Sequence, residues 1–483
     1  MKTQGQSSTT LTMPTDPGHE FEDVVEQLCG QGQQFPKKGQ YPPINNSGFA
    51  ANYATSTSEG TGLPPKQDIG RIMGCFNTKT QLPVLYQLAT NFAICDQWYC
   101  SMPGPTWPNR FFVHGSSSSG LDHSPETSQI KEWEREEPGF EYPNGSIYQA
   151  LSQAGIPYQF YHDSTGLIGG EGSIYSDDPQ NSSIFGAVPQ VASLHGLPNF
   201  SEMELLGTFA SDLQEPYPYP YTFIEPHYGD VYDNNYRGGS SQHPMDDVYG
   251  GEHLLAAVYK AIRSSPYWNT SLLIITYDEH GGFYDSVGPI KAPAPADSPK
   301  YGYNAYGFDF TLLGVRVPAM VVSPLIKKGT VDHTQYDHSS VPKTLEQLFK
   351  LKNLTQRDFK ANSVMPLLTL TTPRTDCPLV INPAAARNPP TPRPTAEQLA
   401  LIDAQPLPEY GYLIGALLNL RKADIELSGK TPAEIAAINT RVQAIQTKGD
   451  ARVYGEEVMK KVGLAREQRR AARRNLVVTE DKT

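Results

Sequence analysis

Residues Ser271 to Asp285 read S-L-L-I-I-T-Y-D-E-H-G-G-F-Y-D, and this stretch decides the fold class. Leu272 to Thr276 is a run of apolar and β-branched residues, typical of a strand buried on both faces of a parallel sheet. Asp278, Glu279 and His280 follow at its carboxyl end, where open α/β sheets bind ligands. Buried carboxylates are costly unless they are paired or bind a cation. The stretch predicts half of a metal site for phosphate-ester chemistry, with a solvated polar strand end as the alternative.

Composition narrows the class of protein. The chain has 483 residues, of which 38% are hydrophobic and 19% charged, and a net charge of -12, which argues against a general nucleic-acid partner. No apolar run approaches the ~20 residues of a membrane span. The first residues, M-K-T-Q-G-Q-S-S-T-T, lack the apolar stretch of a signal peptide. The five cysteines form no C-x-x-C pair, so we expect inert or buried thiols.

Strand-like and helix-like segments alternate along the first three quarters of the chain. This order predicts an α/β fold with a mainly parallel central sheet between helices. The predicted strands cover residues 156–161, 221–224, 272–276 and 317–322, and the predicted helices cover residues 145–154, 247–264 and 339–351.

The last part of the chain differs in character. We predict a catalytic domain over residues 1–370, a Pro-rich linker over 371–398 and a helical C-terminal segment over 399–483. Thr431 to Glu434 reads as a capping box that opens a helix. The final helix carries arginines that predict either a solvated face or peripheral contact with an anionic membrane or partner: Arg466, Arg469, Arg470, Arg473 and Arg474.

A second informative segment is Met102 to Arg110, M-P-G-P-T-W-P-N-R. Its prolines and glycine predict a rigid turn before a helix, whose free N–H groups favour an anion. The Thr106 hydroxyl there is a candidate nucleophile, or only a helix cap. Asn109 and Arg110 are candidates to bind phosphoryl oxygens.

Three histidines lie beside prolines or acids in predicted loops. They are His19 in D-P-G-H, His243 in Q-H-P-M-D-D and His338 in D-H-S-S. Phosphoryl transfer needs charge stabilisation and a proton for the leaving group, which these imidazoles could supply. Each of them alone is more typical of a structural or surface histidine.

Together these segments resemble the phosphoesterase family of bacterial phospholipases C, plant non-specific phospholipases C and certain acid phosphatases. The resemblance runs from about residue 14 to about residue 350. It is carried by D-P-G-H at Asp16, L-P-V-L at Leu82, M-P-G-P-T-W-P-N-R-F-F-V-H at Met102, F-I-E-P at Phe223, H-P-M-D-D-V at His243, I-I-T-Y-D-E-H-G-G-F-Y-D at Ile274 and D-H-S-S-V-P-K-T-L at Asp337.

The resemblance implies an alkaline-phosphatase-like fold and hydrolysis of a phosphate ester or phospholipid. It implies a divalent metal ion held by Asp278, Glu279 and Thr106, although it does not name the metal. Thr106 would be the nucleophile that forms a phospho-enzyme. His19, His243 and His338 would surround the phosphoryl group.

One part of the family pattern is absent from this sequence. The family begins with a strand that runs into Glu-Asn-Arg-Ser-Phe-Asp, whose Glu and Asn complete the metal site. Three explanations are open: an incomplete N-terminus, replacement by a carboxylate such as Asp16, Asp96 or Glu225, or an inactive protein. The rival functions are hydrolysis of a sulfate ester, phosphomutase transfer and a pseudo-enzyme that only binds. The sequence leaves the substrate alcohol and the cellular compartment undetermined.

Overall fold

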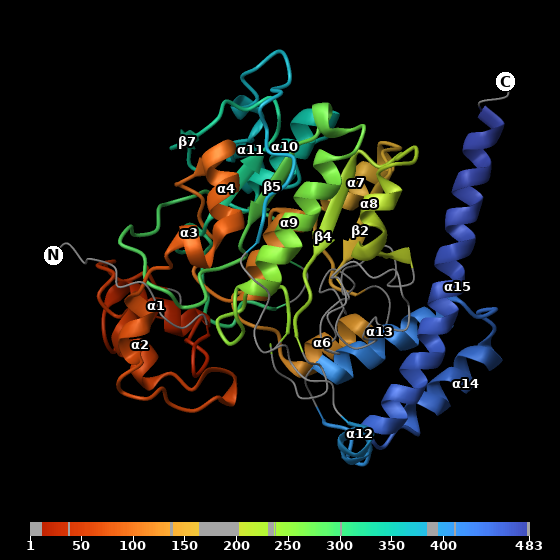
Figure 1. Cartoon of the computed structure of the whole chain (residues 1–483). Coiled ribbons are helices and arrows are strands. Elements are labelled where there is room, and N and C mark those ends of the chain that lie inside the picture. Colours follow the sequence, from red (N-terminus) through yellow and green to blue (C-terminus); the bar gives the residue numbers. More distant parts are fainter. Residues whose placement is uncertain are drawn as a thin grey trace.

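Helices flank two β-sheets in this protein, and a separate group of helices follows at the C-terminal end (Figure 1). The computed structural model describes residues 12–480, except for 37–38, 136–138, 164–201, 230–235, 237, 300–301, 384–394 and 410–411. The excepted residues include part of the predicted linker. No helix among the described residues has the length and apolar character that a membrane span requires.

The larger sheet has the strand order β5-β6-β1-β7. These strands are β5 (Leu273–Thr276), β6 (Ala319–Val322), β1 (Ala93–Cys95) and β7 (Thr330–Asp332). β6 runs antiparallel to both neighbours, whereas β1 and β7 are parallel. The α/β prediction is therefore confirmed, but this sheet is mixed rather than mainly parallel.

The smaller sheet is wholly parallel and has the order β3-β2-β4. Its strands are β3 (Glu204–Leu205), β2 (Tyr158–His162) and β4 (Tyr221–Glu225). The pairing of β2 with β4 places His162 opposite Glu225 at the carboxyl edge. The four strands predicted from sequence all occur, with boundaries that shift by one or two residues.

The first part of the chain, as far as residue 383, contains the following described helices. They are α1 (Phe21–Cys29), α2 (Phe49–Thr55), α3 (Thr78–Gln81), α4 (Pro83–Asn91), α5 (Thr106–Gly115), α6 (Thr127–Arg135), α7 (Ile147–Gln153), α8 (Phe209–Asp212), α9 (Tyr249–Arg263), α10 (Ser340–Phe349) and α11 (Gln356–Lys360). The predicted helices correspond to α7, α9 and α10.

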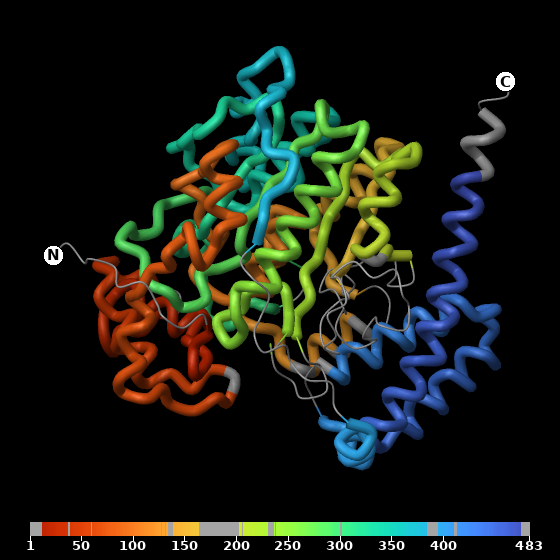
Figure 2. The backbone as a smooth tube through the Cα atoms, in the orientation of Figure 1, coloured from red at the N-terminus to blue at the C-terminus, as the bar shows by residue number. Residues whose placement is uncertain are grey.

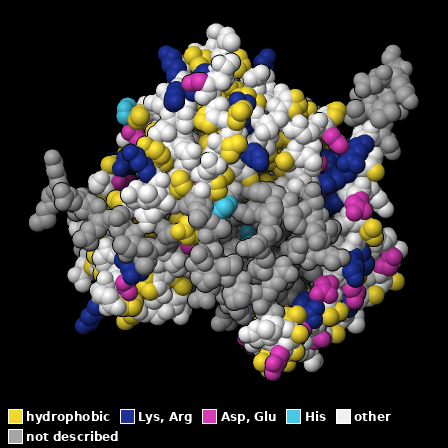
Figure 3. Space-filling model, viewed as in Figure 1, with side chains coloured by type: hydrophobic (Ala, Val, Ile, Leu, Met, Phe, Trp, Pro, Cys, Tyr) yellow, Lys and Arg dark blue, Asp and Glu magenta, His cyan; other side chains and the backbone are white. Residues whose placement is uncertain are grey.

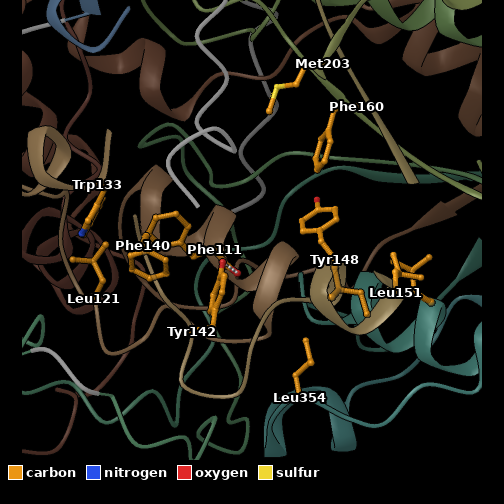
Figure 4. Packing of buried hydrophobic residues seen from close by; sticks show 12 residues of the cluster. Phe111, Leu121, Trp133, Phe140, Tyr142, Tyr148, Leu151, Phe160, Met203 and Leu354 are labelled. Atoms are coloured by element: carbon orange, nitrogen blue, oxygen red, sulfur yellow. Dashed lines mark hydrogen bonds between the residues drawn. The ribbon is translucent and has the colours of Figure 1, made fainter. Parts of the chain in front are cut away.

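A buried aromatic cluster holds α5, the helix that begins at Thr106 (Figure 4). Phe111 of α5 stacks on Phe140 with ring centroids 3.9 Å apart. The Tyr142 hydroxyl donates a hydrogen bond of 2.8 Å to the Phe111 carbonyl oxygen. Offset-stacked aromatic pairs contribute about 0.5–1.5 kcal/mol beyond their area burial, so this cluster fixes the position of the helix.

The C-terminal helices have a hydrophobic cluster of their own, built around Leu413, Tyr454 and Val458. They are α12 (Ala396–Asp403), α13 (Tyr412–Glu426), α14 (Pro432–Gln443) and α15 (Lys448–Glu480), drawn in blue in Figure 2. The predicted capping box at Thr431 and Glu434 is confirmed. The ammonium group of Lys422 in α13 donates to the Trp133 carbonyl oxygen at 2.7 Å, which ties this segment to α6.

The arginines of α15 have partners within the chain. Lys and Arg side chains gather where α15 meets the rest of the molecule (Figure 3). Four contacts account for this: Arg466 with His162 at 3.1 Å, Arg470 with Asp212 at 3.2 Å, Arg473 with Glu204 at 3.2 Å and Arg474 with Glu215 at 3.1 Å. These arginines bind the smaller sheet and α8, so they do not form a purely solvated face. Contact of this helix with a membrane stays a prediction.

The buried carboxyl of Glu346 gives a test of how α10 packs against its neighbours. Burial, together with the neighbouring Asp358, raises the pKa of Glu346 to about 9. A carboxyl whose pKa is higher in the folded than in the unfolded state loses its stabilising contribution as pH rises toward the folded value. The free energy of unfolding of the wild type should therefore fall between about pH 5 and pH 9. The free energy of unfolding of Glu346→Gln should fall less over the same range.

The measurement is the thermal midpoint of both proteins across this pH range. Glu397→Gln, at an exposed position on α12, is the matched control and should follow the wild type. Parallel curves of thermal midpoint against pH for wild type and Glu346→Gln would contradict a raised pKa of Glu346 in the folded protein.

Candidate active site

Six of the eight predicted site residues line one cavity of about 2320 Å³. They are His19, Thr106, Arg110, His243, Asp278 and Glu279. Asn109 and His338 do not line it, and they lie behind its wall. Segments that are far apart in sequence thus converge at the carboxyl edge of β4 and β5, as the position of Asp278 and Glu279 in the sequence predicted.

Thr106 is the first residue of α5, and Pro105 is the N-cap. The Thr106 side chain makes no capping hydrogen bond, so the alternative that it serves only as a cap is wrong. The N-terminus of a helix presents free N–H groups and the positive end of the helix dipole. The hydroxyl therefore lies where a phosphoryl anion would be stabilised.

Asn109 holds the turn before Thr106. Its Oδ1 accepts a hydrogen bond of 3.0 Å from the Met102 N–H. Its Nδ2 donates to the carbonyl oxygens of Met102, Gly104 and Pro105 at 3.2, 2.9 and 3.1 Å. All of its polar atoms serve the backbone, so Asn109 is a positioning residue, and the prediction that it binds phosphoryl oxygens does not fit this structure.

Arg110 reaches the carboxyl edge of the smaller sheet. It forms a buried ion pair with Glu225, the last residue of β4, and its guanidinium lies 5.4 Å from the centroid of the Tyr228 ring. Glu225 also accepts a hydrogen bond from the Tyr228 hydroxyl. Although burial disfavours the charge, Glu225 and Tyr228 raise the pKa of Arg110 above its ordinary value. Arg110 is therefore a permanent cation in the cavity wall.

Asp278 and Glu279 are adjacent carboxylates that lie two and three residues beyond the last residue of β5. Burial, and then the charge of Glu279, raises the pKa of Asp278. Burial also opposes ionisation of Glu279, but the hydrogen bond from His280 and the nearby His19 lower its pKa. Glu279 also accepts a hydrogen bond of 2.7 Å from the Gly281 N–H. Glu279 is buried and Asp278 is half-buried, and two adjacent carboxylates so placed favour a bound cation, so they fit a metal site.

The two glycines after His280 are required by the backbone. Gly281 and Gly282 have φ values of 59° and 72°, in the left-handed region. A Cβ on Gly281 would lie 2.7 Å from the Pro244 ring, and one on Gly282 would lie 2.7 Å from Pro17. The turn therefore brings the loops of His19 and His243 against the end of β5.

His19 and His243 both face Asp16. The distances are 3.4 Å from His19 Nδ1 to Asp16 Oδ2 and 3.6 Å from His243 Nε2 to Asp16 Oδ1. His19 Nδ1 donates to the Pro17 carbonyl oxygen at 2.9 Å, so the lone pair of neutral His19 is on Nε2. Burial, and then His19, lowers the pKa of His243 to about 3, and its ring stacks on Tyr236 with centroids 3.4 Å apart.

Asp16, His19 and His243 also have ligand atoms within 4.8 Å of one another, which is close enough for a cation. However, the Met245 N–H donates to His243 Nδ1 at 3.2 Å. Neutral His243 then carries its proton on Nε2, and a protonated nitrogen cannot ligate a metal. The arrangement fits a carboxylate that orients two imidazoles better than it fits a second metal site.

His338 has a different position from the one expected. The Trp98 indole N–H, which can only donate, lies 3.3 Å from His338 Nδ1, so Nδ1 accepts. The Nε2–H then donates to the Asp278 carbonyl oxygen at 2.6 Å. Both ring nitrogens of His338 are thus occupied, one by Trp98 and one by the backbone at Asp278, and His338 does not line the cavity.

Sequence reasoning gave Tyr228 no role, named His280 only as part of the polar strand end, and suggested Asp16 and Glu225 only as substitute carboxylates. Glu225 carried the same signal as Asp278, an acid at the end of an apolar strand, and Asp16 lies within the D-P-G-H motif. The pairing of Tyr228 with Arg110 depends on a tertiary contact that has no local signal. Asp96, the third suggested substitute carboxylate, also lines the cavity, and it pairs with His333 at 2.8 Å.

The chain belongs to the Phosphoesterase family, whose model matches residues 1–352. Non-specific phospholipase C5 of Arabidopsis thaliana is 36% identical over 386 residues, covering 77% of this chain and 66% of that protein. Non-specific phospholipase C3 of the same plant is 32% identical, covering 76% and 64%. A non-hemolytic phospholipase C of Burkholderia pseudomallei is 28% identical, covering 56% and 40%. The chain thus spans about two thirds or less of the length of these relatives.

Solved structures with a related arrangement include a protein of the alkaline phosphatase superfamily from Vibrio parahaemolyticus. It has a TM-score of 0.29 and 14% identity, covering 57% of this chain and 62% of that one. A phosphonate monoester hydrolase from Silicibacter pomeroyi has a TM-score of 0.31 and 12% identity, covering 61% and 73%.

Substitution of Asn109 tests how the turn before Thr106 is held in place. Asn109→Ala leaves the Met102 N–H and three carbonyl oxygens without this partner, which should lower the free energy of unfolding by about 1–3 kcal/mol. Urea unfolding measures this change. Asn362→Ala removes a single hydrogen bond, to the Gln335 carbonyl oxygen, and is the matched control. Equal losses in both variants would show that Asn109 does not have the role described.

Proposed function

We propose that this protein hydrolyses phosphoric esters, phospholipids among them, through a phosphorylated Thr106. The observation that carries the proposal is the convergence of Thr106, Arg110 and the Asp278–Glu279 pair on one cavity. A hydroxyl at a helix N-terminus, a permanent cation and a carboxylate pair suited to a cation are the groups that phosphoryl transfer uses. The family and its phospholipase C relatives support the same class of reaction.

In the first step, the Thr106 oxygen attacks phosphorus and the bond from phosphorus to the substrate oxygen breaks. Arg110 binds the equatorial phosphoryl oxygens, and Glu225 holds the guanidinium in place. The free N–H groups at the start of α5 share the developing charge. In the second step, water attacks phosphorus, which releases phosphate and restores the hydroxyl.

The histidines have separate roles in this proposal. His19 Nε2 is the atom that gains or loses a proton, because its Nδ1 proton is held by Pro17. It takes the proton of the Thr106 hydroxyl and gives it to the leaving oxygen, then takes one from the attacking water and returns it to the Thr106 oxygen. His243 is kept neutral by burial, and it donates its Nε2–H to a phosphoryl oxygen. Asp16 orients both rings.

Asp278, Glu279 and Thr106 would hold the divalent metal ion. When bound, such an ion lowers the pKa of the hydroxyl and offsets phosphoryl charge. His280 and the Gly281 N–H keep Glu279 ionised and in position, and His338 fixes the backbone at Asp278. These supporting contacts exist in the protein without any ligand.

Thr106→Ala tests the nucleophile. Loss of the attacking oxygen should lower kcat on an aryl phosphate by at least about 1,000-fold. Thr106→Ser keeps a hydroxyl and should retain measurable turnover. Circular dichroism and the thermal midpoint should match the wild type in both variants, because the side chain caps no helix. Near-wild-type hydrolysis by Thr106→Ala would rule out the assignment.

Asp278→Asn tests the metal site. Metal content per chain, measured by mass spectrometry after dialysis against added divalent metal, should fall at least about tenfold, as weakened ligand sets do. Activity should fall with it. Asp309→Asn, an exposed carboxylate, is the matched control and should leave both values unchanged. If wild type and Asp278→Asn hold equal metal, the ion lies elsewhere.

A further inference from the structure

Two loops of the site meet at one hydrogen bond that the proposed chemistry does not use. The Tyr277 hydroxyl donates to Oε1 of Gln242. Tyr277 lies between the end of β5 and Asp278, and Gln242 immediately precedes His243. The bond therefore joins the chain neighbour of a proposed metal ligand to the chain neighbour of a proposed phosphoryl-binding histidine, across 35 residues of sequence.

Gln242 has an unusual backbone conformation. Its φ of 59° lies in the left-handed region, which side chains other than those of Asn, Asp and His rarely adopt. Such a conformation persists only where the surrounding structure fixes it. The residue after His243 is Pro244, which disfavours helical backbone angles at His243. The position of His243 therefore depends on the torsion angles at Gln242.

The Gln242 side chain supplies contacts that fix these angles. Its Nε2 donates a hydrogen bond of 2.9 Å to the carbonyl oxygen of Val248, the N-cap of α9. α9 leaves space for the amide, because a Cβ on Gly251 would overlap the Gln242 side chain. α9 itself packs beside β5 (Figure 1). With Oε1 bound to Tyr277, the amide ties the loop of His243 both to α9 and to the end of β5.

The His243 ring has a defined orientation within this loop. Its Nδ1 accepts a hydrogen bond of 3.2 Å from the Met245 N–H, and its ring stacks on Tyr236 with centroids 3.4 Å apart. Its Nε2 lies 3.6 Å from Asp16 Oδ1. This orientation keeps the proton of neutral His243 on Nε2, the atom proposed to donate to a phosphoryl oxygen. A shift of the loop would break the Met245 contact and release the other tautomer.

We propose that the hydrogen bond from Tyr277 to Gln242 is a clasp that positions His243, and this rests on the phosphoryl-transfer function proposed for the site. Tyr277 and Gln242 both line the cavity, but the Tyr277 hydroxyl and the Gln242 Oε1 are engaged with each other. They are therefore positioning residues, and they act through His243. The clasp also couples the end of β5 to the histidine loop, so that Asp278 and His243 keep one mutual geometry.

Nuclear magnetic resonance of the full chain with isotope-labelled histidine tests the clasp without substrate. Near neutral pH, wild-type His243 should show one tautomer, with the proton on Nε2; its signals are those that disappear in His243→Asn. Tyr277→Phe removes only the hydroxyl and should give His243 the averaged signals of two tautomers, while His19 keeps its own. Tyr99→Phe is the matched control and should change neither, because the Tyr99 hydroxyl also donates to a glutamine, Gln97, at 2.7 Å.

A double-mutant cycle separates positioning from a general loss of structure. Tyr277→Phe should lower kcat on an aryl phosphate about tenfold, as a misplaced catalytic group does. In the His243→Asn background the same substitution should change kcat by less than about twofold, because the residue that the clasp positions is gone. Gln242→Asn is the second variant. Its amide tolerates the left-handed backbone but is one methylene too short to reach Tyr277, so it should match Tyr277→Phe.

The two measurements give separate answers. Altered His243 signals together with a loss of kcat confined to the background that contains His243 support the clasp. Unchanged His243 signals in Tyr277→Phe and Gln242→Asn overturn it, as does a loss of kcat that is absent or is equal in both backgrounds. If the wild type does not hydrolyse the aryl phosphate, the proposed function fails, and the His243 signals alone decide whether the clasp positions this ring.

Discussion

The buried ion pair between Arg110 and Glu225 is the interaction on which the rest of the site depends. It joins the helix that begins at Thr106 to the carboxyl end of β4, and through the nearby Asp278 to the end of β5. A buried charge without its partner is strongly destabilising, typically by about 3–5 kcal/mol. The pair therefore sets where two sheets and one helix meet, and the cavity forms at that meeting point.

The residues proposed to contact a phosphoryl group and the residues that hold them in place have separate positions here. Thr106, Arg110, His19 and His243 line the cavity, whereas Asn109 and His338 lie outside its lining and donate to backbone carbonyl oxygens. This division explains why a compact set of motifs contains so many polar residues. Two of the eight predicted site residues, Asn109 and His338, hold the backbone instead, and a sequence motif cannot distinguish this from a role in chemistry.

The sequence predicted the strands, the helices α7, α9 and α10, and the convergence of six site residues, because each has a local signal in apolar pattern or turn chemistry. It did not predict the roles of Asn109 and His338, because these depend on which atoms their nitrogens reach across 7 and 60 residues of chain. The antiparallel direction of β6 and the pairing of the α15 arginines are likewise tertiary features.

The proposed mechanism requires that the Thr106 oxygen becomes covalently phosphorylated during turnover. The most direct test is an acid quench of the enzyme after mixing with an aryl phosphate, followed by digestion and mass spectrometry of the peptide that contains Met102 to Arg110. We expect a phosphoryl group on Thr106 that forms at the same time as the burst of released alcohol and that is absent in Thr106→Ala. Hydrolysis at the wild-type rate with no phosphorylated peptide, or with the label on another residue such as His19, would contradict it.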